Sequence, residues 1–319
     1  MAIQKKEIII EVPHRISGFF EIVDELNGIK INNPERIGSR GAGFNLSAVG
    51  RTKVQIENIY ESNMEGINIY INNEKKNQKA ETSYYIYNFI KKYLNFPVKI
   101  NIFHNFDLPV GCGYGASGSG ALGAAYGLNY VLDLNFSNYD LGKIAHVAEV
   151  INRTGLGTVC GQLCGGLCML KEPGYPCVSE SIEIPKNLKV ICGTFGMIHT
   201  KEVLNDPLLN VKIKKAGKRA LIRLIENQNI QTFMKVSLAF VKESEILDIL
   251  NLTEINELLE DLNKLKILGA SMNQLGRSVY AICKEENEEQ VLEIFNSYHP
   301  KIKINNLYIN EKGLQILKT

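Results

Sequence analysis

The chain has 319 residues, of which 45% are hydrophobic and 22% are charged, and its formal net charge at pH 7 is +2. This length requires one large domain or two closely packed ones, and the composition excludes an extended disordered chain. The small net charge excludes the strong positive field of a protein that holds nucleic acid or an anionic membrane, so we expect neither partner.

The N-terminal part of the chain has the pattern of several strands and one helix. The helix is predicted over residues 82–94, where apolar side chains recur with helical spacing. Runs rich in β-branched residues predict strands at residues 8–12, 53–60, 67–71 and 98–103. The apolar run that opens the first strand is too short for the core of a signal peptide.

A glycine-rich stretch without charges follows the predicted strands. Residues 108–132 are long enough on paper to span a membrane, but seven of these 25 residues are glycine and Pro109 opens the run. We therefore predict a loop over residues 109–121 that leads into a helix at 119–131. A second helix is predicted at residues 141–152, with one buried face.

A cluster of helix and strand breakers, Glu-Pro-Gly-Tyr-Pro at residues 172–176, predicts a boundary between two domains, residues 1–175 and 176–319. Beyond the cluster the order is strand, two helices, strand, helix, strand, which is typical of helices packed on one sheet. The predicted strands are residues 188–194, 278–283 and 303–309, and the predicted helices lie within 216–243, 255–267 and 288–296.

The glycine-rich loop has the features of a phosphate-binding site. Gly111, Gly113 and Gly115 occupy alternate positions, where residues without side chains let backbone N–H groups turn inward. The helix that follows would direct its positive dipole end at the same place, and a serine on its first turn could reach a Mg²⁺ ion bridging the phosphates. The loop therefore predicts a site for nucleotide phosphates.

Two other nucleotide-binding loops are alternatives for this segment. A Walker loop is excluded because the Gly-Lys-Ser/Thr ending is missing. The spacing Gly113-x-Gly115-x-x-Gly118, with Asp133 twenty residues after Gly113, formally matches the dinucleotide fingerprint. A dinucleotide loop requires the strand to run almost straight into its first glycine, whereas Asp107 and Pro109 intervene here, so a nicotinamide cofactor is disfavoured.

The loop resembles the second motif of the GHMP kinases, Pro-x-x-x-Gly-Leu-Gly-Ser-Ser-Ala-Ala, with Gly113, Gly115 and Ser117 in its frame and Ala116 in place of the first serine. Residues 12–17 are similar to the first motif, Ala-Pro-Gly-Arg-Val-Asn, with a histidine replacing the glycine. Further segments resemble the archaeal pantoate kinases of this family, and they are residues 17–21, 38–43, 154–157, 165–166 and 271–276.

The resemblance covers nearly the whole chain and implies an α+β, two-lobed fold, with an N-terminal ATP-binding lobe and a C-terminal ferredoxin-like sandwich. It also implies an ATP- and Mg²⁺-dependent kinase that phosphorylates pantoate for coenzyme A synthesis. A kinase for another small alcohol and a weakly active or regulatory relative remain alternatives. We expect a cytoplasmic protein, and the sequence leaves open whether it forms a homodimer.

The resemblance assigns candidate site residues. Catalytic residues are Ser117, Glu149 and Thr158, of which Ser117 and Glu149 would also hold Mg²⁺. Nucleotide-binding residues are Pro109, Gly111, Gly113, Gly115, Ala116, Ser117, Gly118 and Ser119. Substrate-binding residues are Ser39, Arg40, His146, Lys171 and Thr200. His146 and Glu149, spaced i, i+3, share one helix face. For an arbitrary helix such a pair would be solvated, but the glycine-rich loop before it and residues 154–157 after it favour a role at the site.

One position departs from the family pattern. Where the family has an aspartate nine residues after the glutamate, this chain has Thr158, which cannot accept a proton at neutral pH. Transfer by positioning and charge stabilisation alone is physically reasonable, because a loose transition state needs little help from a base. Gln162, one helical turn further on, could orient a hydroxyl group but could not deprotonate it.

The cysteines are predicted to be reduced thiols. Seven is an odd number, and the chain lacks the cysteine density of a small disulfide scaffold. Cys160, Cys164 and Cys168 recur every four residues along a predicted helix and could suggest a metal site. The usual two-residue spacing of metal-binding pairs is absent, so we interpret them as small buried thiols.

Overall fold

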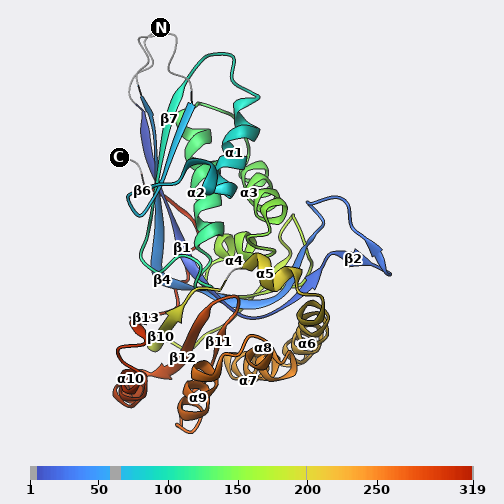
Figure 1. Ribbon diagram of the computed structural model, residues 1–319, viewed down its shortest axis with the longest axis vertical. Helices are drawn as coiled ribbons and strands as arrows, with labels where there is room; N and C mark the ends of the chain where they lie inside the picture. Colours follow the sequence, from blue (N-terminus) through green and yellow to red (C-terminus); the bar gives the residue numbers. More distant parts are fainter. Residues whose placement is uncertain (1–5, 58–65, 199, 318–319) are drawn as a thin grey trace.

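The computed structural model describes residues 6–57, 66–198 and 200–317, and it has an upper and a lower lobe (Figure 1). The upper lobe is built on a mixed sheet with the order β14-β1-β4-β7-β5-β6, and β8 and β9 continue it from β4. Its strands are β1 (Glu7–Val23), β4 (Gly38–Glu57), β5 (Gly66–Ile71), β6 (Glu74–Lys75), β7 (Lys99–Phe106), β8 (Leu167–Leu170), β9 (Ser179–Ile182) and β14 (Gln315–Leu317).

The long antiparallel pair β1 and β4 joins the two lobes. In the upper half of β1, buried and less buried side chains alternate as predicted, and Ile8, Ile10 and Val12 are buried on the helix side. Its lower half has both faces covered, and Phe20 there packs against Phe240 of the lower lobe at a ring distance of 5.8 Å. Burial of both faces removes the alternation, which explains why the predicted strand ended at residue 12. Residues 58–60 of another predicted strand lie outside the described residues.

Three helices cover one face of the upper sheet, namely α1 (Glu81–Lys91), α2 (Ala116–Val131) and α3 (Asn138–Asn152) (Figure 1). The helix α2 is buried on nearly all sides, and Gly123 and Gly127 let it approach the side chains of Thr52 and Val54. Close packing inside the lobe accounts for the uncharged stretch that could have suggested a membrane segment. None of the described helices is long and apolar enough to cross a membrane.

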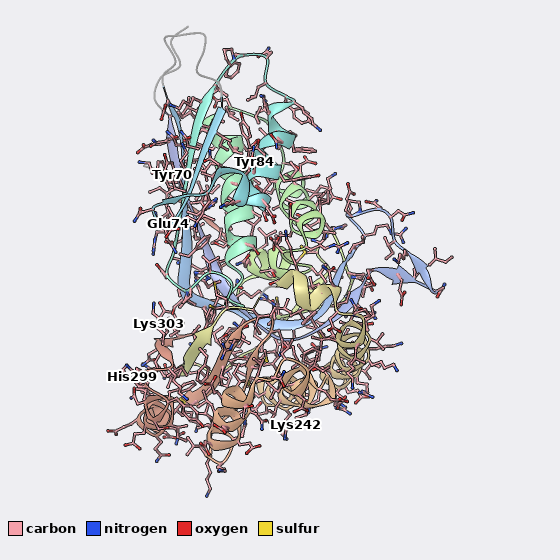
Figure 2. All side chains as sticks on the ribbon, in the orientation of Figure 1. Tyr70, Glu74, Tyr84, Lys242, His299 and Lys303 are labelled. Carbon is pink, nitrogen blue, oxygen red and sulfur yellow. A yellow bond between two sulfur atoms is a disulfide. The ribbon has the colours of Figure 1, made fainter. Side chains whose placement is uncertain are left out.

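The lower lobe is a four-stranded sheet in the order β11-β12-β10-β13, covered by helices as the sequence predicted. Its elements are β10 (Leu188–Gly196), α6 (Pro207–Glu226), α7 (Ile230–Glu243), α8 (Ile246–Ile249), α9 (Thr253–Leu262), β11 (Gly269–Asn273), β12 (Arg277–Lys284), α10 (Glu288–Ser297) and β13 (Lys303–Leu307). The strand β11 was not predicted. Lys242 and His299 project from the outer surface of this lobe (Figure 2).

The two lobes do not correspond to the predicted domains, residues 1–175 and 176–319. The strands β9 and β14 both lie beyond this residue, yet β9 pairs with β8 and β14 pairs with β1 in the upper sheet. The chain therefore enters the lower lobe at β10 and returns to the upper lobe at its C-terminal end. The breaker cluster at residues 172–176 is the turn between β8 and β9.

The cysteine prediction is wrong for two residues, because Cys160 and Cys177 form a disulfide with their Cα atoms 5.4 Å apart. Cys160 lies on α4 (Thr158–Cys164), and the turn after β8 brings Cys177 back against this helix. Cys168 lies on β8, so the three regularly spaced cysteines do not share one helix. Sequence spacing could not show this pairing because it depends on the turn between β8 and β9.

Candidate functional site

The loop between β7 and α2 has the tightly turned backbone conformation that its alternate glycines predicted. Gly111, Gly113 and Gly115 have φ angles of 78°, 86° and 68°, in the left-handed region that disfavours side chains. Gly115 is also the N-cap of α2, so the positive end of this helix dipole faces the turn. The loop can therefore present backbone N–H groups to an anion.

A buried histidine connects the two ends of this loop. His14 Nδ1 lies 2.9 Å from the carbonyl oxygen of Tyr114, and the N–H group of Leu108 lies 3.3 Å from His14 Nε2. Burial lowers the pKa of His14 to about 4, so the ring is neutral and donates from Nδ1. The histidine that replaces the glycine of the family motif thus supports the phosphate loop.

Contacts from the rest of the molecule also hold the loop. The Nε2 group of Gln162 donates to the carbonyl oxygens of Pro13 and Gly115, at 2.9 Å each, and the side chain is fully buried. Gln162 therefore supports the loop, and it does not line the cavity. From the lower lobe, the backbone N–H group of Ile198 donates to the carbonyl oxygen of Gly111 at 3.0 Å.

A cavity of about 430 Å³ lies beside this loop and is lined by both lobes. Nine predicted site residues line it, and they are Ser39, Arg40, Gly111, Gly113, Gly115, Ala116, Ser117, Thr158 and Thr200. The predicted nucleotide-binding and substrate-binding residues therefore meet at one place. Six other predicted residues lie outside the lining, and they are Pro109, Gly118, Ser119, His146, Glu149 and Lys171.

Glu149 lies directly behind the lining. Its carboxylate accepts hydrogen bonds from Ser117 Oγ at 3.2 Å and from Thr154 Oγ1 at 2.6 Å, and both donors line the cavity. Burial raises the pKa of Glu149 to about 7 despite these two hydroxyl groups. A carboxylate and a serine hydroxyl side by side at a phosphate loop are oxygen ligands that suit Mg²⁺.

The raised pKa of Glu149 predicts a pH-dependent stability. Between the usual pKa of 4.5 and about 7, the folded protein holds a proton that the unfolded chain has lost. The free energy of unfolding should therefore fall by about 1 kcal/mol per pH unit as the pH rises through this window. Denaturant titrations at several pH values should show this slope in the difference between wild type and Glu149→Gln. Parallel curves for the two proteins would contradict the assignment.

Two predicted substrate ligands point elsewhere. His146 is buried, and its Nε2 lies 3.0 Å from the carbonyl oxygen of Ile37, so it supports the chain just before Ser39. The helix face that carries His146 is covered by the chain at Ile37 and by the ring of Tyr175. Lys171 is exposed, and its Nζ pairs with Glu180 at 3.0 Å. The structure therefore does not bring Lys171 to the acceptor.

The gathering of cations at the cavity was only partly predicted. The lining includes Arg15, Arg40, Arg153 and Lys201, and it includes no Asp or Glu among the described residues. Arg40 makes a bidentate pair with Glu21, at 3.0 and 2.9 Å, which fixes its orientation. The cavity is therefore suited to anionic ligands.

Apolar side chains form another part of the cavity wall. Phe19 and Phe20 contribute from β1, Ala42 from β4, Leu156 from the loop before α4, and Leu170 from β8. These residues face the same space as Ser39 and Arg40. The cavity can therefore hold a ligand that carries both an anionic group and a compact hydrocarbon part.

Several lining residues were not assigned a role from the sequence, and they are Arg15, Ser17, Thr154, Lys201, Gln274 and Leu275. Most of them lie in segments that resembled the family, including residues 12–21, 154–157 and 271–276. The segments could be found from the sequence, but their contact with the cavity depends on how β1 and the turn after β11 cross between the lobes.

Comparisons with known proteins agree with this geometry. A family model described as the N-terminal domain of GHMP kinases matches residues 82–166, which include the phosphate loop and Glu149. The chain is 32% identical to a pantoate kinase from Methanocaldococcus jannaschii over 287 residues, which cover 89% of this chain and 96% of the relative. It is 29% identical to a pantoate kinase from Thermococcus kodakarensis, with coverage of 93% and 94%.

A solved structure described as a phosphotransferase related to the coenzyme A biosynthesis pathway superposes on the chain with a TM-score of 0.84. The two sequences are 27% identical, and the alignment covers 98% of this chain and 99% of the other. The similarity therefore extends over both lobes and includes the cavity between them.

Proposed function

We propose, from the premise that this chain belongs to the GHMP kinase family, that it transfers the γ-phosphoryl group of ATP to the 4-hydroxyl group of pantoate. The observation that carries the proposal is that one cavity joins the phosphate loop to a wall of cations and apolar side chains. The chain would thus act in coenzyme A synthesis, in the cytoplasm where ATP is available.

On the nucleotide side, the backbone N–H groups of residues 111–115 would bind the phosphates, together with the positive end of the α2 dipole. Ser117 and Glu149 would hold the Mg²⁺ ion, which supplies positive charge against the phosphate oxygens when it is bound. Because the pKa of Glu149 is about 7, protons compete with the cation for this carboxylate below neutral pH.

On the acceptor side, the lining matches the chemistry of pantoate. Pantoate has a carboxylate, two hydroxyl groups and a carbon bearing two methyl groups. Arg40 would face the carboxylate, Ser39 and Thr200 would bind hydroxyl groups, and Phe19 and Leu170 would pack on the methyl groups. The ammonium group of homoserine would instead meet cations and no lining carboxylate among the described residues, which disfavours this alternative acceptor.

The phosphoryl transfer would proceed without a general base at position 158. Thr158 begins α4, and its methyl group lies under the loop, so close that a methyl group added at Gly115 would be 2.8 Å from it. Because the transition state is loose, the cations and the loop would supply most of the stabilisation. Thr158 then serves as a spacer beneath the phosphate loop.

Substitutions at Thr158 test this role. Thr158→Ala should leave kcat within a few-fold of wild type, because no proton transfer is lost. Thr158→Asp should give no large gain, since its charge would face the γ-phosphate. General-base assistance contributes roughly 10²–10⁴-fold where it operates, so steady-state kinetics can distinguish the two cases. A wild type that is nearly inactive and is strongly rescued by Asp would identify a degenerate enzyme.

Arg40 and Lys171 provide a matched pair for the acceptor site. Arg40→Met should raise KM for pantoate about tenfold or more and leave KM for ATP nearly unchanged, because hydrogen bonds to charged groups contribute about 1.5–3 kcal/mol. Lys171→Met should have a smaller effect, since Lys171 pairs with Glu180 outside the lining. A larger effect on KM for pantoate at Lys171 would restore the assignment made from sequence.

A release assay for ADP over pantoate, homoserine, mevalonate and shikimate tests the proposed function. Pantoate should give the highest kcat/KM by at least roughly 10²-fold, since each of the other acceptors lacks the dimethyl carbon, the 2-hydroxyl group or a matching charge. Preference for another acceptor would redirect the proposal to a different small alcohol. No release with any of them would favour the regulatory alternative.

A further inference from the structure

Arg15 is a buried cation at the edge of the cavity. Only 3% of its surface is exposed. Its guanidinium packs directly against Gly161, so closely that a methyl group added there would lie 2.1 Å from Nε. Its Nη1 group donates to Asn45 Oδ1 and its Nη2 group to Cys168 Sγ, both at 3.3 Å. Among the ion pairs of the described residues, none gives Arg15 a carboxylate. A buried guanidinium without an anion is strongly destabilising.

The sulfur atom of Cys168 lies where such an anion is needed. Cys168 is fully buried on β8, and the thiol of Cys164 on α4 is its other close polar partner. The remaining neighbours in this cluster carry no charge, because Cys160 and Cys177 form a disulfide and Tyr175 has a pKa raised to about 12 by burial. Arg15 is therefore the charge that faces Cys168, and Cys164 is its titratable partner.

We propose that Cys168 is a thiolate that serves as the counter-ion of Arg15 and thereby positions this cation at the phosphate-binding end of the cavity. Arg15 lines the cavity beside this end, because its backbone N–H group donates to the carbonyl oxygen of Tyr114 in the phosphate loop at 3.0 Å. Cys168 does not line the cavity, so its effect on the reaction passes through Arg15.

The electrostatics of the cysteine pair agree with this placement. The hydrogen bond from Cys164 and the charge of Arg15 lower the pKa of Cys168, against the opposing effect of burial. The hydrogen bond to Cys168, burial and the charge of Cys168 raise the pKa of Cys164, so the proton stays on that sulfur. Cys168 ionises first because it accepts the hydrogen bond from Cys164 and because the guanidinium of Arg15 donates to its sulfur atom. At neutral pH the pair then holds one proton and one negative charge.

Thiolate absorbance tests the ionisation without any substrate, so its outcome is independent of the acceptor proposed above. Wild type should lose one thiolate signal per chain when the pH falls from about 8 to 5, and Cys168→Ser should lack this step. The buried thiols of Cys112, Cys192 and Cys283 stay protonated in this range because burial raises their pKa. A step that disappears in Cys164→Ser and persists in Cys168→Ser would overturn the assignment.

The kinetic test separates charge from packing and rests on the proposed function. Cys168→Ser, which is close in size but neutral, should lower kcat/KM for ATP about tenfold. Cys168→Asp, which restores an anion, should recover most of this loss, whereas a role in packing alone would favour serine over aspartate. Equal activity of wild type and Cys168→Ser, measured beside a normal thermal unfolding curve, would refute the positioning role. If the Asp variant does not fold, the thiolate titration still decides the proposal.

Discussion

Glu149→Gln is expected to lower kcat by roughly 10²-fold or more, the scale of losing one electrostatic stabiliser in an active site. Glutamine keeps the size of the side chain and its hydrogen bond from Ser117, but it removes the charge that would hold Mg²⁺. The carboxylate lies 3.2 Å from Ser117 Oγ and is fully buried, so water cannot supply a substitute ligand easily. Steady-state kinetics at several Mg²⁺ concentrations should show a higher requirement for the cation.

The matched control is Glu180→Gln, because Glu180 is a half-buried glutamate that pairs with Lys171 outside the cavity lining. This variant should keep kcat close to wild type. Near-normal turnover of Glu149→Gln at saturating Mg²⁺ would contradict the role of this carboxylate. Loss of activity that is explained by unfolded protein at the assay temperature would instead assign Glu149 to stability, so the folded fraction is measured on the same preparations.

Gly113→Ala should lower kcat/KM for ATP by roughly 10²-fold as well, because it displaces donors aimed at the phosphates. Gly113 has a φ angle of 86°, and a methyl group there would lie 2.8 Å from the backbone oxygen of Gln274. The loop must then shift away from the turn that follows β11. Since the loop also borders the acceptor, some loss of kcat is expected together with the loss of affinity for ATP.

Gly28→Ala is the control for backbone strain alone. Gly28 has a φ angle of 77°, yet nothing lies within 4 Å of the added methyl group, and the residue is in the exposed turn of the β2–β3 hairpin (Glu25–Leu26 and Ile29–Lys30). Gly28→Ala should lose stability through backbone strain alone and keep its affinity for ATP, whereas Gly113→Ala should lose more stability, because of the contact with Gln274, and should lose affinity for ATP. Equal kinetics in the two variants would show that the loop does not bind phosphates.

The local features of the fold followed from the sequence. The strand pattern of residues 67–71, the helical stripe of residues 82–94 and the glycine-rich loop all depend on short-range rules of side-chain spacing and backbone freedom. The α+β class and the GHMP kinase fold are confirmed by the family model and by the similar solved structure. They could be predicted because the sequence motifs that carried the resemblance are local as well. The phosphate loop could be identified because Gly111, Gly113 and Gly115 stand at alternate positions, and all three adopt positive φ angles.

Features that depend on packing between distant segments did not follow from the sequence. The full lengths of β1 and β4 were missed, since their lower halves are buried on both faces and show no alternation. The disulfide of Cys160 and Cys177 requires the turn between β8 and β9. The resemblance to the family placed Lys171 at the acceptor, whereas in the structure it pairs with Glu180.

Arg15 shows the same limit in the site itself. The sequence placed it inside a family motif, but its importance comes from burial, from Gly161 beside it and from the sulfur of Cys168, which lies 153 positions away along the chain. No spacing rule connects these residues. A cation and its counter-ion that belong to different strands can be recognised only after the sheet is assembled.

Identification of the phosphorylated product is the most direct test of the central claim. The purified chain would be incubated with ATP, Mg²⁺ and pantoate, and the phosphorus resonances of the products would be recorded together with the ADP formed. A pantoate kinase should yield one phosphate monoester on the 4-hydroxyl group for each ADP released. ADP that forms equally without pantoate, or a phosphate carried by another acceptor in a mixture that contains pantoate, would contradict the proposed reaction.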